Sequence, residues 1–292
     1  ITFSSGLKYA HIATNNSFDF YNINNQQLIL DVSKSNDFNY TENVTAAYAI
    51  VNLKFNESLK LNAGARIENT DSRGQLISES NVNNKDVPRN YTDFFPNVGL
   101  SFNNQKDHAW SLSIGRRVNR PNYQDLNPFE TPISQLTVWK GNPFLIPNYI
   151  MNYQGSYSYN QKLIVTGVYS VTTDFFANIF EITGDNRNQI IPRNMDKVVN
   201  YGLNINYPFE ISKSWNFVGF INAYYREYEG SLEGTNIDLS VNNYNFRMQN
   251  NIKLPWDITL DLTYFIENNW IWRGSINVRG NQELNLGLRK NF

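Results

Sequence analysis

The sequence contains no cysteine and only 2 histidines among its 292 residues. Without cysteine there can be neither a disulfide framework nor a thiolate metal site. His11 and His108 lie far apart, without the spacing of metal ligands, and neither belongs to a recognisable Ser-His or Asp-His arrangement. The sequence also has no G-x-S-x-G, P-loop or G-x-G-x-x-G pattern. We therefore expect no metal, no cofactor and no enzymatic activity.

Charge and long apolar runs are also sparse. Charged residues make up 17% of the chain and the net charge is -1, with no basic block, so we expect no nucleic-acid partner. No run of 18 or more apolar residues is present, and the mean hydropathy is -0.49, which argues against helical membrane spans. These values are compatible with a β-barrel, because half of every barrel strand faces the lumen and is polar.

The clearest positive pattern is a strict alternation of apolar and polar residues between positions 241 and 267. Two alternating runs of roughly ten residues flank a tight turn at 255–257, and each run is long enough to cross a bilayer at a tilt. The polar face carries mostly Asn, Gln and Thr, whereas a soluble sandwich would show many Lys and Glu there. This pattern predicts a membrane-spanning hairpin with one face toward a water-filled lumen.

The same rhythm extends along the whole chain. Short turns near positions 56, 104, 161, 213 and 256 alternate with longer polar segments, which we predict to be loops, at about residues 15–39, 69–90, 117–147, 184–197, 230–238 and 268–280. Outer-membrane barrels have this asymmetry, with short periplasmic turns and longer outer loops. We count about twelve strands, so the predicted fold class is all-β, an antiparallel transmembrane β-barrel.

Aromatic residues are abundant, at 15% of the chain. Trp110, Trp215 and Trp256 lie close to short turns, and aromatic groups such as Tyr91, Phe94 and Phe95, or Tyr224, Tyr225 and Tyr228, lie toward the other ends of strands. These positions predict two aromatic girdles at the membrane boundaries. The alternative is that Tyr and Phe are simply good strand formers.

Residues 115–129 read GRRVNRPNYQDLNPF, and residues 141–148 read GNPFLIPN. This region resembles the TonB-dependent receptors of the Bacteroidetes, in which a strand ending in R-R-x-x-R-P-x-Y-x-x-L-N-P-F leads into an outer loop containing G-N-P-x-L-x-P. The similarity covers the whole chain, including N-Y-T-E-N at 39–43 and the final L-G-L-R-K-N-F. The matching motif residues are Arg116, Arg117, Arg120, Pro121, Tyr123, Leu126, Asn127, Pro128, Phe129, Gly141, Asn142, Pro143, Leu145 and Pro147.

The resemblance implies a multi-pass barrel of 22 strands in the outer membrane of a Gram-negative bacterium, with an N-terminal plug. Such a receptor is energised by TonB and takes up a ligand too large or too scarce for porins. The 292 residues lack the plug, the energy-coupling segment and about ten strands, and open strand edges are prohibitive in lipid. We therefore expect residues 1–292 to be part of one barrel domain, completed by missing N-terminal strands or by another chain.

Five residues of the long loop are candidate binding residues. Alternation places Arg117 on the polar side with Ser113 and Gly115, where it would meet an anionic group of a plug or substrate. The alternative for the arginines is structural, because they can hold the loop through carbonyl or carboxylate hydrogen bonds. Loop aromatics can stack on a sugar or peptide ligand, pack the loop on itself, or contact a surface lipoprotein. The candidate residues are Arg117, Arg120, Tyr123, Phe129 and Trp139.

Two other functions compete with that of a receptor. The chain can be a structural or accessory barrel subunit of a larger outer-membrane complex, without transport of its own. An upstream plug with an energy-coupling motif would favour the receptor. A soluble or secreted β-sheet adhesin is the third possibility, and it would require a protein that stays monomeric without detergent.

Overall fold

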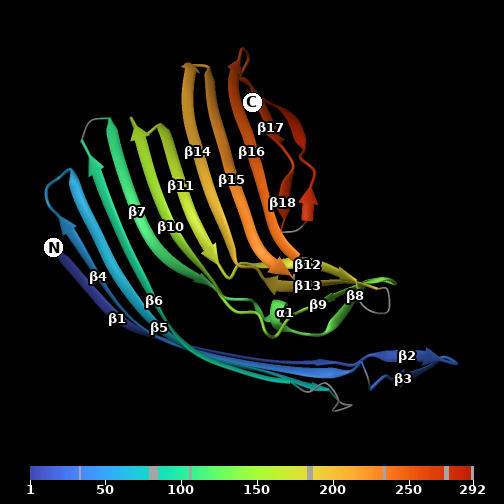
Figure 1. Ribbon diagram of the computed structural model, residues 1–292. Coiled ribbons are helices and arrows are strands. Elements are labelled where there is room, and N and C mark those ends of the chain that lie inside the picture. Colours follow the sequence, from blue (N-terminus) through green and yellow to red (C-terminus); the bar gives the residue numbers. More distant parts are fainter. Residues whose placement is uncertain are drawn as a thin grey trace.

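Twelve long strands form one curved antiparallel sheet, in which each strand pairs with its neighbours along the sheet order (Figure 1). The count agrees with the number predicted from the alternation. The computed structural model describes residues 1–32, 34–78, 85–104, 107–182, 187–232, 235–272 and 276–290. In sheet order the strands are β1 (Thr2–Phe18), β4 (Asn36–Lys54), β5 (Leu59–Ser78), β6 (Lys85–Asn103), β7 (His108–Asn119), β10 (Asn148–Tyr159), β11 (Leu163–Thr173), β14 (Lys197–Ser212), β15 (Trp215–Leu232), β16 (Thr235–Leu254), β17 (Ile258–Glu267) and β20 (Gln282–Lys290).

Short turns join the strands at one end of the sheet, which we call the turn side. Among the described residues these turns lie at 55–58, 160–162, 213–214 and 255–257, where the sequence predicts them. Asn160 and Gln161 both have positive φ, as do Trp256 and Asp257, which matches the right-handed twist of the flanking strands in a tight hairpin. The opposite end is the loop side, where the longer segments lie (Figure 1).

Several predicted loops are in fact extensions of strands on the loop side. The prediction of loops at 69–90 and 230–238 is wrong over most of these ranges, because β5, β6, β15 and β16 continue into them. Within 15–39 only the two ends, 15–18 and 36–39, belong to the long strands β1 and β4. In these extensions polar residues stand on both faces, so the alternation disappears although the ladder of backbone hydrogen bonds continues. Pro96 lies inside β6, just where the pairing of this strand with β7 ends at Asn97. A missing N–H is tolerated at such an edge.

Smaller elements occupy the loop side. Strand β11 ends before Asp174, whose φ is 55°, a conformation that Asp tolerates better than most residues. The short elements are β2 (Tyr21–Asn24), β3 (Gln27–Leu30), α1 (Tyr123–Leu126), β8 (Glu130–Ser134), β9 (Thr137–Lys140), β12 (Phe176–Ile182), β13 (Asn188–Asn194), β18 (Trp270–Trp272) and β19 (Ile276–Val278). Strands β12, β13, β9 and β8 form a separate small sheet, and β2–β3 and β18–β19 are hairpins.

Side chains alternate between two faces of the main sheet. We call the face that bears Tyr153, Tyr169 and Tyr201 the outer face, and the face that bears Ser113 and Gln154 the inner face. Registers without bulges carry this assignment across the sheet from β1 to β16, except at the turn-side end of β14.

Two apolar clusters pack against the inner face on the loop side. One joins β4 to the loop between β7 and β10, and the other joins β14 and β15 to β12. The loop segments are therefore packed onto the sheet at this end.

Candidate functional site

The loop at residues 120–147 packs on the inner face of β4. Its side chains Leu126, Phe129 and Leu145 form a buried cluster with Phe38 and Tyr40 of β4. Leu145 is 0% exposed and Phe38 is 1% exposed, so the contact is a fully desolvated core. Burial of this kind stabilises by about 1.5 to 3 kcal/mol per large side chain, which is enough to hold the loop in one position.

The backbone of this loop closes on itself through the motif residues. Asn122 caps α1 in a reciprocal capping box with Asp125. The N–H of Gly141 donates to the carbonyl of Asn127 at 2.9 Å. A Cβ at Gly141 would lie 2.7 Å from the carbonyl oxygen of Gln124 and closer still to that of Asn127. Only glycine fits at this approach of two backbone segments, which gives the G-N-P motif a physical reason.

Arg120 anchors the start of the loop to β5. Its Nη2 donates to Glu68 Oε2 at 2.8 Å and to Thr70 Oγ1 at 3.0 Å. Arg66 Nε lies 2.5 Å from the other carboxylate oxygen of Glu68. Because Glu68 is only 7% exposed, removing one partner would leave a buried charge poorly compensated. Arg120 thus has the structural contact that we weighed as the alternative to ligand binding.

Arg116 spans the gap that opens where β6 and β7 stop pairing. Its Nη1 donates to the carbonyl of Phe94 at 2.8 Å, and its Nη2 lies 3.6 Å from Asp93 Oδ1. The guanidinium lies 4.3 Å from the ring centroid of Tyr149, and the Tyr149 hydroxyl donates to Asp93 Oδ2 at 3.0 Å. These contacts join β6, β7 and β10 beyond the end of the ladder.

A polar pocket of about 400 Å³ lies against the inner face next to this network. Arg117 is exposed and forms no hydrogen bond or ion pair within the described residues. No carboxylate lines the pocket, so guanidinium and carboxamide groups, together with the Ser113 hydroxyl, are the polar side chains offered there. Such a set suits a carboxylate or phosphate oxygen. The polar lining includes Asn62, Arg66, Asn97, Arg117 and Asn152.

The structure divides the five predicted binding residues among different surroundings. Arg117 lines the inner pocket, whereas Arg120 lies beside β5. Tyr123 packs its ring against Phe38, and Phe129 is buried with its ring centroid 5.7 Å from that of Phe18. Trp139 is half-buried in β9. No single site gathers all five, and their role in binding stays a prediction.

Sequence reasoning did not single out Arg66, Glu68 or Asp93, although Arg66 and Glu68 stand on the polar face of an alternating run. The available signal for this network was a pair of opposite charges, two residues apart on the same face of one strand. Their partner Arg120 is 52 positions away from Glu68 in the chain, and the sequence alone does not supply that contact.

The histidines have ordinary surroundings. The His11 ring is hydrogen-bonded to Asn43 and the His108 ring to the Tyr157 hydroxyl, each at 2.8 Å. Over the residues that the structure describes, no three His, Cys, Asp or Glu side chains are grouped so as to hold a metal ion. Within the same ranges no helix is long and apolar enough to cross a membrane.

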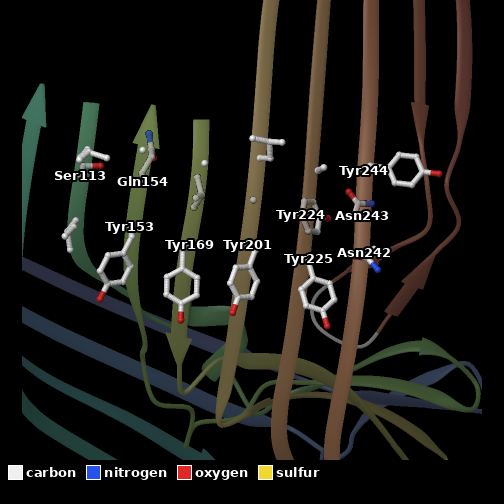
Figure 2. A pocket seen from close by; sticks show the side chains of 18 residues that line it. Ser113, Tyr153, Gln154, Tyr169, Tyr201, Tyr224, Tyr225, Asn242, Asn243 and Tyr244 are labelled. Atoms are coloured by element: carbon white, nitrogen blue, oxygen red, sulfur yellow. The ribbon is translucent and has the colours of Figure 1, made fainter. Parts of the chain in front are cut away.

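Four tyrosines stand side by side on the outer face. Tyr153, Tyr169, Tyr201 and Tyr225 occupy directly paired positions of β10, β11, β14 and β15. Their ring centroids are 5.2 to 6.2 Å apart, within the range for aromatic pairs. Figure 2 shows the four rings in a row with their hydroxyl groups directed toward the loop side. We call them the tyrosine row.

The whole chain, residues 1–292, matches the outer membrane protein beta-barrel family. The protein belongs to this family. Its antiparallel sheet is therefore part of an outer-membrane β-barrel, which crosses the outer membrane with many strands. No protein in the curated set matches the sequence.

Solved structures similar to this outer-membrane barrel protein are receptors and transporters. The copper transporter OprC has a TM-score of 0.69 at 13% identity, covering 97% of this chain and 45% of its own. The ferric yersiniabactin uptake receptor FyuA from Yersinia pestis has a TM-score of 0.62 at 12% identity, and the match covers 98% of this chain and 43% of the receptor. The ferric-catecholate import receptor Fiu from K12 E. coli has a TM-score of 0.61 at 11% identity, and the match covers 98% of this chain and 45% of the receptor. Identities this low show a shared fold, and this chain spans less than half the length of each.

In this outer-membrane barrel protein the outer face is the lipid-facing one, because its exposed side chains are apolar while the inner face is polar. Tyr225 of the tyrosine row lies at one end of the outer face, and Trp110 and Trp215 lie on the same face next to the short turns, as predicted for aromatic girdles. Trp256 lies in a short turn and is 80% exposed. Tyr91, Phe95, Tyr224 and Tyr228 were assigned to a girdle as well, but alternation places all four on the inner face.

Proposed function

We propose that this chain supplies the barrel wall, the lumen lining and the outer loops of a TonB-dependent receptor that takes up a ligand too large or too scarce for porins. The observation that carries the proposal is the anchored 120–147 loop. A general porin leaves an aqueous channel, whereas here a buried cluster and the Arg120–Glu68 contact hold a loop over the inner face on the loop side. A fixed loop suits selective binding better than free diffusion.

The similar structures point in the same direction. They are receptors for ferric siderophores and a transporter of copper, so an iron chelate and a copper ion are the first ligands to test. TonB would act through a plug that lies outside these 292 residues. We assign Arg117 to contact with an anionic group of that plug or of the ligand, and Tyr123 and Trp139 to the loop surface that meets the ligand or a surface lipoprotein. Phe129 is buried, so its part is to hold that loop in place.

The deciding experiment uses the protein extracted from outer membranes in mild detergent. Its intact mass is expected to exceed the 33.9 kDa of the 292 residues, and the protein is expected to bind the purified periplasmic domain of TonB. Cells that carry it should accumulate radiolabelled ferric siderophore or copper only when TonB is present. A mass of 33.9 kDa together with no TonB binding would favour the accessory barrel subunit.

A further inference from the structure

The outer face carries a shallow apolar groove directly beside the tyrosine row. Its volume is about 810 Å³. At its floor Gly155 and Gly167 face each other in neighbouring strands, so two adjacent positions lack side chains at the same height. A Cβ at Gly167 would meet nothing within 4 Å. The paired positions along this row are Leu112, Gly155, Gly167, Leu203, Ala223 and Tyr244.

On the outer face, directly paired residues of neighbouring strands form rows that run across the sheet. The composition of successive rows locates this groove relative to the membrane surface. On the turn side of the tyrosine row the outer face is apolar. Two rows beyond it, on the loop side, Lys197, Glu229 and Asp238 stand at paired positions, and Glu227 lies one row closer. Charged side chains are costly in the hydrocarbon, so the tyrosine row marks its boundary. The groove therefore opens on the hydrocarbon side of that boundary.

The tyrosine row supplies polar groups at the loop-side rim of the groove. Each ring is an apolar body with a hydroxyl at its tip, and the four hydroxyls are directed toward the charged rows (Figure 2). Beyond them, on the loop side, β14, β15 and β16 bear three carboxylates and one ammonium, and Lys197 Nζ is already paired with Glu229 Oε2 at 3.0 Å. The rim thus combines hydroxyl donors with an excess of negative charge.

An apolar side chain in the membrane is always in contact with lipid tails. It gains no free energy when one tail replaces another, because the two tails are equally apolar. Selective association in a membrane depends on close van der Waals packing and on polar contacts. A floor of two glycines permits close approach of a chain, and a rim of this charge is complementary to an ammonium group. From this combination we propose that the outer groove is a specific lipid site. One acyl chain lies along Gly155 and Gly167, and the head group carries an ammonium that faces Glu227 and a phosphate that accepts from the tyrosine hydroxyls.

The test uses the protein extracted from outer membranes and depleted of lipid, with native mass spectrometry as the readout. Phosphatidylethanolamine, which carries an ammonium, is compared with phosphatidylglycerol, which does not. Gly167→Leu fills the floor of the groove. Ala63→Leu is the matched control, because Ala63 lies on the outer face in the same cross-sheet row as Tyr153, on the distant strand β5. Heat-dependent gel mobility confirms that each variant is folded.

We expect the unaltered protein to retain phosphatidylethanolamine in preference to phosphatidylglycerol. Gly167→Leu should abolish this retention while Ala63→Leu preserves it, and Glu227→Gln should remove the preference but keep the binding of both lipids. Equal retention of the two lipids by the unaltered protein would overturn the proposal. So would retention that survives Gly167→Leu, an equal loss in Ala63→Leu, or a second protein molecule that Gly167→Leu releases in place of lipid.

Discussion

Neighbouring arginines of one motif have different surroundings in this protein. Arg120 shares the carboxylate of Glu68 with Arg66, whereas Arg117 is exposed at the inner pocket. The sequence predicts that Arg117 is on the polar side and that both arginines lie at the start of a loop. It cannot separate their roles further, because the partner of Arg120 lies on β5, far away in the chain. A buried carboxylate that needs two guanidinium partners is a tertiary feature, so it becomes visible only when the strands are placed.

The contrast between these two arginines gives a first prediction. Arg120→Ala leaves the buried Glu68 with one partner, and we expect a loss of about 1 to 3 kcal/mol in stability. Arg117→Ala removes an exposed side chain, and we expect a change within about 0.5 kcal/mol. Thermal unfolding in detergent and the rate of proteolysis within residues 120–147 measure both. Equal effects of the two substitutions would contradict the structural role of Arg120.

The G-N-P motif gives a second prediction. Gly141→Ala places a Cβ against two backbone carbonyls that cannot move as a side chain would, and we expect a cost of about 1 to 3 kcal/mol from this overpacking. Gly167→Ala is the control, since its Cβ has open space. Faster proteolysis of the 120–147 loop should accompany Gly141→Ala alone. An unchanged loop in Gly141→Ala would mean that the close approach is absent in solution.

Tyr40 gives a pH-dependent prediction. Burial first, and then the hydrogen bond from its hydroxyl to Glu42 at 2.8 Å, raise the pKa of this phenol above the ordinary value of 10.0. A raised pKa favours the neutral form in the folded state, so the stability it contributes is present below pH 10 and is lost as the pH rises through the folded pKa. The loop that packs on Tyr40 should therefore loosen in strong alkali.

Tyrosinate absorbance tests this directly. The difference between the titrations of the unaltered protein and of Tyr40→Phe should contain a transition well above pH 10, because that difference isolates one phenol among 18 tyrosines. A transition centred near pH 10 would show that Tyr40 is accessible to water and that the cluster is open.

At the scale of elements, alternation predicts the parts of the strands that lie between lipid and lumen, because only there do the two faces meet different solvents. The turns at 160–162 and 255–257 were predictable for the same reason, since they interrupt an otherwise regular pattern. The loop-side ends of β5 and β6 were not predictable. Residues 69–75 are polar on both faces, and the exposed pair of Arg73 and Asp86, with Nη2 2.6 Å from Oδ2, is too local a signal to indicate a strand.

These extensions can be tested by hydrogen exchange. Residues 70–76 are paired with both β4 and β6, whereas residues 85–91 are paired with β5 alone. All amides of 70–76 and every second amide of 85–91 should therefore exchange far more slowly than those of an unstructured loop. Mass spectrometry of the protein in detergent resolves these segments from the membrane-spanning parts of β5 and β6. Exchange that is complete within the shortest labelling time would show that the ladder ends near the membrane surface.

At the scale of the whole molecule, the sheet has two edge strands, β1 and β20, each with a neighbour on one side only. Unpaired backbone groups cost several kcal/mol each in hydrocarbon, so in the outer membrane both edges must be hydrogen-bonded. Pairing of β1 with β20 would close a barrel of twelve strands. Pairing of each with further strands would give the larger barrel that the resemblance to TonB-dependent receptors implies.

Cysteine cross-linking separates these two closures, and these 292 residues contain no cysteine of their own that would compete. We expect no disulfide between a cysteine at Leu7 in β1 and cysteines placed one at a time along β20, because strands of the missing part of the barrel should stand between them. The positive control pairs Leu7→Cys with Ala47→Cys, which are directly opposite in β1 and β4 and lie within the Cα separation that a disulfide spans, roughly 4.4 to 6.8 Å. Efficient cross-linking of β1 to β20 in the outer-membrane protein would establish a twelve-stranded barrel, whose lumen is too narrow for a plug, and would rule out the receptor proposed above.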